Sequence, residues 1–292
     1  MRRRLDAELV RRGLAESRTQ AQGYIDAGRV RVGGAIASKA AHQVAPGDAV
    51  VVTGEPPRYV GRGAEKLLGA LERFHLDPGG LRALDAGAST GGFTDVLLQH
   101  GATSVVALDV GHGQLHERLR ADDRVVVLER TNLRHVDPAG LGPFGAVVAD
   151  LSFISLTVVM QVLVDCCAPD GWLVLLVKPQ FEAGRREVSK GRGVIVDPDQ
   201  WRGALERVAG SALAAGARVD GLCRSPLHGA DGNVEFLLLL RPDPDARSAG
   251  PDQSSTGHSS TDHSSTGRSS TDLPDVVAAM IEGAVGDAAE VA

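Results

Sequence analysis

Three ionisable side chains of this 292-residue sequence stand where a charge needs a partner. Lys178 and Asp150 each end an apolar run, and Glu235 lies inside a third run that is otherwise apolar up to its terminal arginine. An unpaired charge in an apolar environment is costly. These positions therefore predict an ion pair between Lys178 and Asp150, and a basic partner for Glu235. A purely structural ion pair is the alternative for the first of them.

Lysine is rare in this chain, which makes its positions informative. Of the 31 lysines and arginines, four are lysines, and these are Lys39, Lys66, Lys178 and Lys190. An arginine cannot be deprotonated in a protein, whereas burial tunes a lysine. Lys39 and Lys190 lie in polar, loop-like stretches, but Lys66 lies in GRGAEKLLGAL and Lys178 in LLVKPQFE. These two lysines, with the aspartate and the glutamate above, predict one site in which an amine accepts a proton.

A glycine-rich turn stands between a predicted strand and a predicted helix. Residues 85–93 read DAGASTGGF, an acid followed by G-x-x-x-G. The G-x-G-x-x-G pattern of dinucleotide sites fails because Ser89 interrupts it. Glycines let a ligand approach the backbone, and the helix N-terminus offers free N–H groups. The pattern is typical of the first motif of S-adenosylmethionine (SAM) enzymes, in which the acid faces a cationic ligand. A tight turn without a ligand is the alternative.

Acids also end two further predicted strands. Asp109 ends the run 104–109, where a carboxylate is placed to accept from both hydroxyls of an adenosine ribose; a helix cap is the alternative. With Asp85 and Asp150, it defines one crevice at the carboxyl ends of a sheet. The expected SAM-binding residues are Asp85, Gly87, Ser89, Thr90, Gly91, Gly92, Phe93, Asp109 and Asp150.

Alternating apolar strands and helical stretches must position these side chains. The predicted strands are 81–86, 104–109, 125–128, 145–150, 172–178, 217–225 and 234–241. Such alternation predicts an α/β fold with a mostly parallel sheet covered on both faces. We expect this domain over 61–241, after a small α+β domain over 1–54 and a linker over 55–60. A low-complexity insertion over 242–272, with a repeated Ser-Ser-Thr, and a helix over 273–288 follow.

The charge is unevenly distributed. The net charge is −6, yet residues 1–58 hold 10 basic against 6 acidic residues. The acidic chain therefore contains a basic segment, residues 1–58, which we call the basic head. Basic patches of this kind bind phosphates. Three cysteines without C-x-x-C spacing exclude a disulfide framework or a zinc ribbon. No apolar run approaches the ~18 residues of a membrane span, and the charged start lacks an apolar signal core. We therefore expect a cytoplasmic protein without a metal.

Taken together, the motifs resemble those of the TlyA-type ribosomal RNA 2′-O-methyltransferases, an FtsJ-like SAM-dependent group also known as hemolysins. The resemblance covers about residues 3–241, and 5–54 are similar to an S4 RNA-binding module. The motifs that carry it are LDAGASTGGFTDVLL, LDVGHGQL, VVLERTN, VADLSFISL, LVKPQFE and GNVEFLLLLR. His112 departs from the family, which often has Tyr there. The resemblance implies a Rossmann-like methyltransferase sheet, mostly parallel, with its last strand antiparallel.

The resemblance also implies a catalytic tetrad of Lys66, Asp150, Lys178 and Glu235, with Lys178 as the base. It implies SAM as cofactor, and ribosomal RNA within ribosomal subunits as partner, methylated on a ribose that we expect to be a cytidine's in the small or large subunit. We expect a monomer that does not act on membranes. The expected RNA-binding residues are Arg3, Arg4, Arg11, Arg12, Arg18, Arg29, Arg62, Arg185 and Arg186. The alternatives are a non-catalytic S4-type RNA- or ribosome-binding factor and a membrane-active hemolysin.

Overall fold

The computed structural model describes residues 2–15, 18–54, 58–182, 194–229, 231–244 and 273–291. The chain divides into two compact units, a small unit of Met1–Arg58 and a large unit of Tyr59–Ala292. Arg185, Arg186, residues 55–57 of the expected linker and most of the Ser-Ser-Thr region lie outside the described residues. Among the described helices, none is long and apolar enough to cross a membrane.

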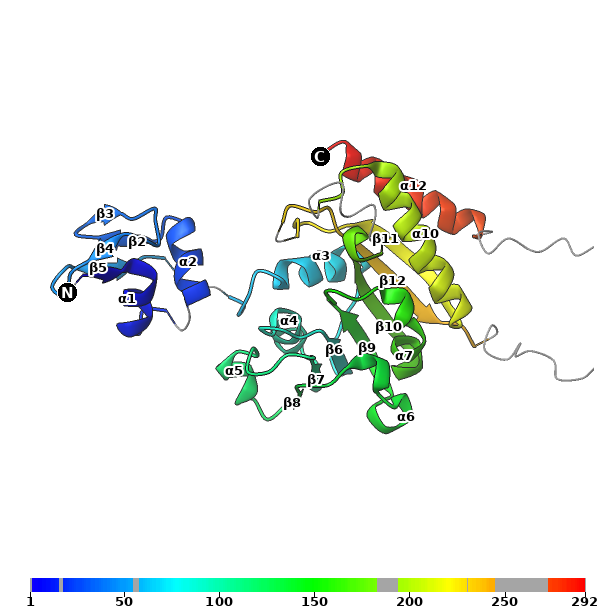
Figure 1. The fold of residues 1–292 in the computed structure, drawn as a ribbon. Coiled ribbons are helices and arrows are strands. Elements are labelled where there is room, and N and C mark those ends of the chain that lie inside the picture. The colour runs from blue at the N-terminus through cyan, green and yellow to red at the C-terminus, as the bar shows by residue number, and fades with distance from the viewer. Residues whose placement is uncertain are drawn as a thin grey trace, which may run out of the picture. The chain divides into compact units, whose positions relative to one another are not determined.

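The small unit packs two helices against short strands (Figure 1). Its elements are β1 (Arg3–Arg4), α1 (Leu5–Arg11), α2 (Arg18–Asp26), β2 (Val30–Val32), β3 (Ala35–Ile36), β4 (Gln43–Val44) and β5 (Val50–Val52). The strand β2 pairs antiparallel with both β3 and β5, and β1 pairs with β4. Leu5 and Leu9 on one face of α1 and Ile25 of α2 bury themselves against Val30 and Val44. This core holds the unit together, because it removes the apolar faces of both helices from water.

A seven-stranded sheet forms the centre of the large unit. Its strands are β6 (Arg82–Ala86), β7 (Ser104–Leu108), β8 (Val125–Leu128), β9 (Phe144–Ala149), β10 (Cys167–Val177), β11 (Ala217–Arg224) and β12 (Phe236–Pro242). The spatial order is β11-β12-β10-β9-β6-β7-β8. The last strand, β12, runs antiparallel to both of its neighbours, and the pairs from β10 to β8 are parallel. The predicted α/β sheet with a reversed last strand is confirmed.

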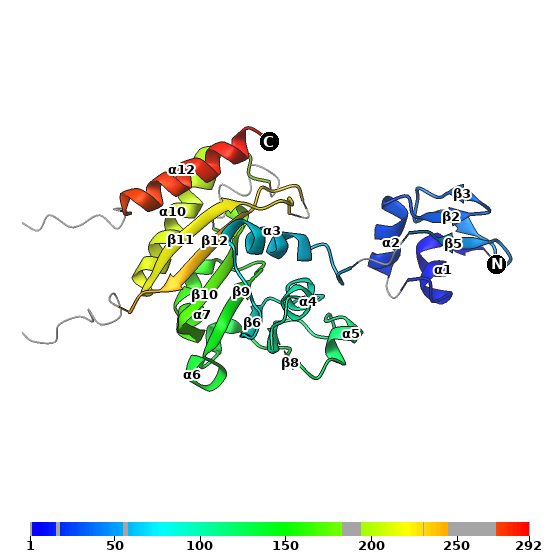
Figure 2. The same cartoon turned by 180° about the vertical axis from the view of Figure 1, so that it is seen from behind.

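Helices cover both faces of this sheet (Figures 1 and 2). They are α3 (Ala64–Phe74), α4 (Gly92–Gln99), α5 (Glu117–Arg120), α6 (Pro138–Leu141), α7 (Met160–Cys166), α8 (Pro179–Glu182), α10 (Pro198–Ala214) and α12 (Asp275–Ala289), with the 3-10 turns η1 (Leu133–His135) and η2 (Leu156–Val158). Leu84 and Val106 share one core with α7, α10 and α12. Their chain neighbours Ala83 and Val105 share the other with α3 and α4. Alternate strand residues therefore supply the two cores, as the pleat requires.

The topology brings the candidate residues to one edge of the sheet. Asp109, Asp150 and Lys178 directly follow the parallel strands β7, β9 and β10. Glu235 instead directly precedes β12. Because β12 runs in the opposite direction, its beginning lies at the same edge as the ends of the parallel strands. The reversed strand thereby places Glu235 beside the other acids.

Candidate active site

Two ion pairs join the four residues of the predicted tetrad. The Nζ atom of Lys178 lies 2.5 Å from Oδ1 of Asp150, and Nζ of Lys66 lies 2.5 Å from Oε2 of Glu235. Lys66 also lies 3.9 Å from Oδ2 of Asp150. Both lysines and Glu235 are buried. Two ammonium groups and two carboxylates therefore compensate one another in one cluster, which is what buried charges require.

Each member of this cluster is fixed by the element that carries it. Lys66 lies in the first turn of α3, where its N–H donates to the carbonyl of Gly63 at 3.0 Å. The backbone N–H of Asp150 donates to Ala86 of the adjacent strand at 3.1 Å. The carbonyl of Glu235 accepts from the N–H of Ser225 at 2.8 Å. Helix α3 and the strand ends thus fix the backbone of Lys66, Asp150 and Glu235 through contacts that do not depend on the ion pairs.

The glycine-rich turn packs directly against the tetrad. Gly87 has a φ of +86°, and a Cβ on it would lie 2.6 Å from the carbonyl oxygen of Asp150. Any side chain there would collide with backbone, so both the conformation and the space require glycine. The turn ends at Gly91, which precedes α4. The N-terminus of α4 and the tetrad therefore face the same space.

Asp85 is a fully buried acid beside this turn. Its Oδ2 atom accepts from the N–H of Thr94 at 2.8 Å and from the Thr94 hydroxyl at 2.6 Å. Its buried Oδ1 atom has no hydrogen-bond partner among the described residues. Burial raises the pKa of Asp85 to about 7, with the two Thr94 hydrogen bonds opposing and the charges of Asp150 and Asp109 adding to the rise. A buried acid with an unused oxygen is suited to a cationic or hydrogen-bond-donating ligand.

Asp109 connects the turn to the loop after β7. Its Oδ2 atom accepts from the N–H of Ser89 at 2.8 Å, and its Oδ1 atom accepts from the N–H of Gly111 at 2.6 Å. Further along this loop, His112 contacts Glu129 at 2.8 Å. Asp109 therefore organises two loops, a role that its place at the end of a strand did not indicate.

A cavity of about 530 Å³ opens between these elements. Its lining includes all four tetrad residues and, from the predicted cofactor set, Asp85, Gly87, Ser89, Thr90, Gly92, Phe93 and Asp150. Gly91 and Asp109 do not line it. The volume lies in the usual range for small-molecule sites. Three features of this cavity fit a cationic ligand such as SAM. They are its carboxylates, the backbone at Gly87, which a ligand can approach closely, and Oδ1 of Asp85, which has no hydrogen-bond partner among the described residues.

The cavity also holds residues that the sequence analysis did not single out. Ser152 accepts a hydrogen bond from Nζ of Lys178 at 3.0 Å. Phe153 is 92% exposed, has a φ of +65°, and lies with its ring centroid 5.3 Å from that of Phe181. The Phe181 ring in turn lies 5.8 Å from the Lys178 ammonium. The signal was present in VADLSFISL and LVKPQFE, where polar or aromatic residues follow the strand ends.

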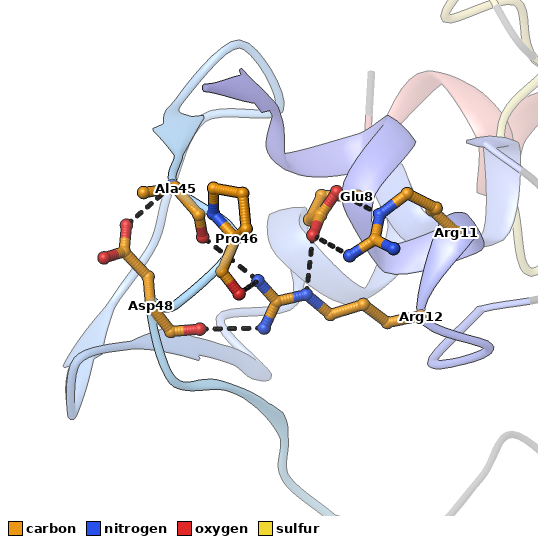
Figure 3. A network of polar contacts seen from close by, with 6 residues as sticks. All are labelled: Glu8, Arg11, Arg12, Ala45, Pro46 and Asp48. Carbon is orange, nitrogen blue, oxygen red and sulfur yellow. Dashed lines mark hydrogen bonds and ion pairs between the residues drawn. The ribbon is translucent and has the colours of Figure 1, made fainter. Parts of the chain in front are cut away.

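The basic head contains arginines of two kinds. Arg12, whose side chain is 18% exposed, donates to Glu8 and to the carbonyls of Ala45, Pro46 and Asp48 (Figure 3). It joins α1 to the loop before β5 and has a structural role. Arg29 similarly donates to two carbonyls, at 2.9 and 3.3 Å. The remaining described candidates of the head, Arg3, Arg4, Arg11 and Arg18, are exposed, and three of them also pair with acids: Arg4 and Arg18 with Asp6, and Arg11 with Glu8. Arg62, which is also exposed, belongs to the large unit and lines the cavity.

Comparisons with known proteins agree with this geometry. The profile of the FtsJ-like methyltransferases matches residues 59–242, and that of the S4 domain matches residues 3–50. The 16S/23S rRNA (cytidine-2′-O)-methyltransferase TlyA of Mycobacterium tuberculosis is 53% identical over 84% of this chain and 91% of its own length. Hemolysin A of Brachyspira hyodysenteriae is 39% identical over 80% and 98%. A solved structure from Streptococcus thermophilus, named as a candidate hemolysin, superposes with a TM-score of 0.69 at 34% identity, over 99% of this chain and 98% of its own.

Proposed function

Since the chain belongs to the FtsJ-like methyltransferase family, we propose that it transfers a methyl group from SAM to a ribose 2′-hydroxyl of ribosomal RNA, on a cytidine of the small or large subunit. The observation that carries this proposal is the cluster of two ion pairs, Lys66–Glu235 and Lys178–Asp150, beside the glycine-rich turn. Its substrate would be rRNA within ribosomal subunits, and the enzyme would act in the cytoplasm as a monomer.

When bound, SAM supplies an electrophilic methyl group on a positively charged sulfur. The residues suited to hold it are Asp85, whose Oδ1 has no hydrogen-bond partner among the described residues, and the backbone of the turn at Gly87 and Ser89. Asp109 fixes the shape of that turn through the Ser89 N–H. Holding both reactants in one orientation is itself a large part of such catalysis.

The amine of Lys178 is the group best placed to take the proton of the 2′-hydroxyl. In its neutral form it accepts this proton as the oxygen becomes nucleophilic. Asp150, at 2.5 Å, then stabilises the ammonium that results, and Ser152 accepts from it at 3.0 Å. The Lys66–Glu235 pair keeps a second cation near Asp150. The carboxylate of Asp150 is therefore shared between Lys178 and Lys66.

Two aromatic rings beside Lys178 suit the base of the target nucleotide. Bases that are flipped out of a nucleic-acid stack commonly stack on aromatic side chains of the protein. The exposed ring of Phe153, next to Phe181, offers such a surface at the mouth of the cavity. In the small unit, the exposed Arg3, Arg4, Arg11 and Arg18 would contact phosphates, which orient RNA without specifying its sequence.

The test is a methylation assay with SAM labelled in its methyl group and purified ribosomal subunits, followed by mapping of the modified nucleotide. K178A should lose at least about 100-fold in rate, because the proton acceptor is removed, while SAM binding measured by calorimetry persists. SAM binding without transfer by the natural chain would favour a non-catalytic RNA-binding factor. Leakage of liposomes caused by the purified protein would favour a membrane-active hemolysin.

A further inference from the structure

The segments that follow β9 and β10 run side by side and are joined at three places near the cavity. Lys178 pairs with Asp150 at 2.5 Å and donates to Ser152 at 3.0 Å. One step further along, the rings of Phe153 and Phe181 lie with their centroids 5.3 Å apart. The loop after Asp150 and the short helix after Lys178 thus form one wall of the cavity.

A fourth connection joins the two segments, and no step of the proposed methyl transfer uses it. The carboxylate of Glu182 accepts from the hydroxyl of Ser155 at 2.5 Å and from the N–H of Leu156 at 2.9 Å. Leu156 is the first residue of η2, so Glu182 caps this turn from another segment. Burial raises the pKa of Glu182, and these two hydrogen bonds, together with the charge of Arg207, oppose the rise. The Ser155 and Leu156 donors therefore offset part of the cost of burying this carboxylate.

The backbone of Glu182 is held by a contact with α10. Its backbone carbonyl accepts from Nη2 of Arg207, on α10, at 3.2 Å. Leu156, which receives the carboxylate, is buried in the core shared with α10. Both partners of the connection are therefore fixed to the body of the large unit. Glu182 therefore connects the C-terminal end of the loop 151–155 to the rest of the large unit, whereas Asp150 lies at the N-terminal end of this loop.

Phe153 is the residue that needs this constraint. Its φ of +65° is a conformation that a phenylalanine rarely adopts. Its ring is 92% exposed, so burial in the core does not hold it there. Strained backbone persists only where the surrounding structure over-determines it. Asp150 fixes the chain three residues before Phe153, and Glu182 fixes it two and three residues after, at Ser155 and Leu156.

We propose that Glu182 is a positioning residue for the RNA substrate: by binding Ser155 and Leu156, it holds the ring of Phe153 beside that of Phe181, at the cavity that Lys178 also lines, where the target base would stack. This inference rests on the proposed function for its substrate. The positioning itself is a property of the protein alone. Two experiments therefore test the two parts separately.

The first experiment measures steady-state methylation of ribosomal subunits by E182A, E182Q, F153A and the double variant. E182A should raise KM for the RNA about tenfold, because stacking of one base on an aromatic ring is weakened, with the Kd for SAM unchanged. E182Q keeps an acceptor for Leu156 and should recover most of the loss. In the F153A background, E182A should have little further effect, since the two residues act through one contact. Equal losses in both backgrounds would overturn the proposal, and E206A, at an exposed glutamate of α10, is the control.

The second experiment does not need methyl transfer. Both natural tryptophans, Trp172 and Trp201, are buried, so F153W adds one exposed fluorophore. In this background, E182A should lower the fluorescence anisotropy of the new indole and increase its quenching by acrylamide, while E182Q and E206A should leave both unchanged. Unchanged anisotropy with E182A would contradict the positioning role even if the enzyme assay succeeds. Absence of methyl transfer by the natural chain would contradict the proposed function and leave this result intact.

Discussion

The ammonium of Lys66 lies 2.5 Å from the carboxylate of Glu235, 169 residues further along the chain, and both side chains are buried. Lys66 has a second acid within reach, Asp150 at 3.9 Å. The Lys66–Glu235 pair therefore determines how strongly the carboxylate of Asp150 interacts with Lys178. The consequences of disturbing it are specific and measurable.

Removing the charge of Glu235 should harm both stability and rate. In E235Q, the buried ammonium of Lys66 keeps Asp150 as its one ion-pair partner among the described residues and draws it away from Lys178. Breaking one partner of a buried pair costs about 3 kcal/mol of unfolding free energy. The methylation rate should fall on the order of tenfold, since the base is misoriented rather than removed. Chemical denaturation and single-turnover methylation measure the two effects; a natural rate in E235Q would contradict this use of the pair.

Gly229 should be intolerant of a side chain for a reason that involves the same acid. A Cβ at Gly229 would lie 2.7 Å from Oε1 of Glu235. G229A should therefore displace Glu235 from Lys66, cost about 1–3 kcal/mol as overpacking does, and lower the rate while the Kd for SAM is kept. G283A is the matched control, because a Cβ at Gly283 of α12 would meet no atom of the described residues within 4 Å. Equal behaviour of the two variants would refute the prediction.

Asp85 should give the stability a characteristic pH dependence. Its pKa is about 7 in the folded chain against an ordinary value of 3.8, so the folded state binds a proton that the unfolded state releases. Stability from this group is full below pH 4 and is lost as the pH rises through 7, by about 4 kcal/mol in total. D85N should abolish this part of the slope. Denaturation at pH 4, 5.5, 7 and 8 compares the two proteins, and parallel slopes would be inconsistent with the prediction.

Asp85 should make SAM binding stronger as the pH rises, although its ionisation makes the folded chain less stable. A cationic ligand favours the ionised carboxylate, so binding to the protonated form must release its proton. The affinity should rise about tenfold between pH 6 and 8, and calorimetry in buffers of different ionisation enthalpy should detect the released proton. D85N should bind weakly, with no such rise. A pH-independent Kd in the natural chain would argue against contact between Asp85 and the ligand.

Two arginines of the small unit should behave differently. R12A removes the donors that join α1 to the carbonyls of Ala45, Pro46 and Asp48, so it should lower the melting temperature of the small unit. R3A removes an exposed side chain of β1, so it should weaken RNA binding and reduce the slope of log K against log salt by about 1 without changing the melting temperature. Filter binding from 50 to 300 mM salt, with calorimetric melting, separates the two roles. Reversed effects would show that Arg12 is the RNA contact.

Several features of the sequence determined much of the fold by themselves. A parallel sheet covered on both faces needs strands that are apolar throughout, and runs such as 145–150 and 172–178 meet that need. A charge that ends such a run cannot stay unpaired, which is why Lys178 and Asp150 stood out. The rarity of lysine drew attention to Lys66 as well.

Only the tertiary structure decided which side chains share a surface. Whether an arginine binds acceptors far along the chain is not visible in the sequence, so Arg3 and Arg12 look alike there, although Arg3 is exposed and Arg12 donates to three carbonyls. Phe153 and Glu182 lie in segments that the sheet brings together, and neither stood out in the sequence. Local patterns follow from the period of a strand or a helix, whereas the contacts of a polar side chain follow from the arrangement of the whole sheet.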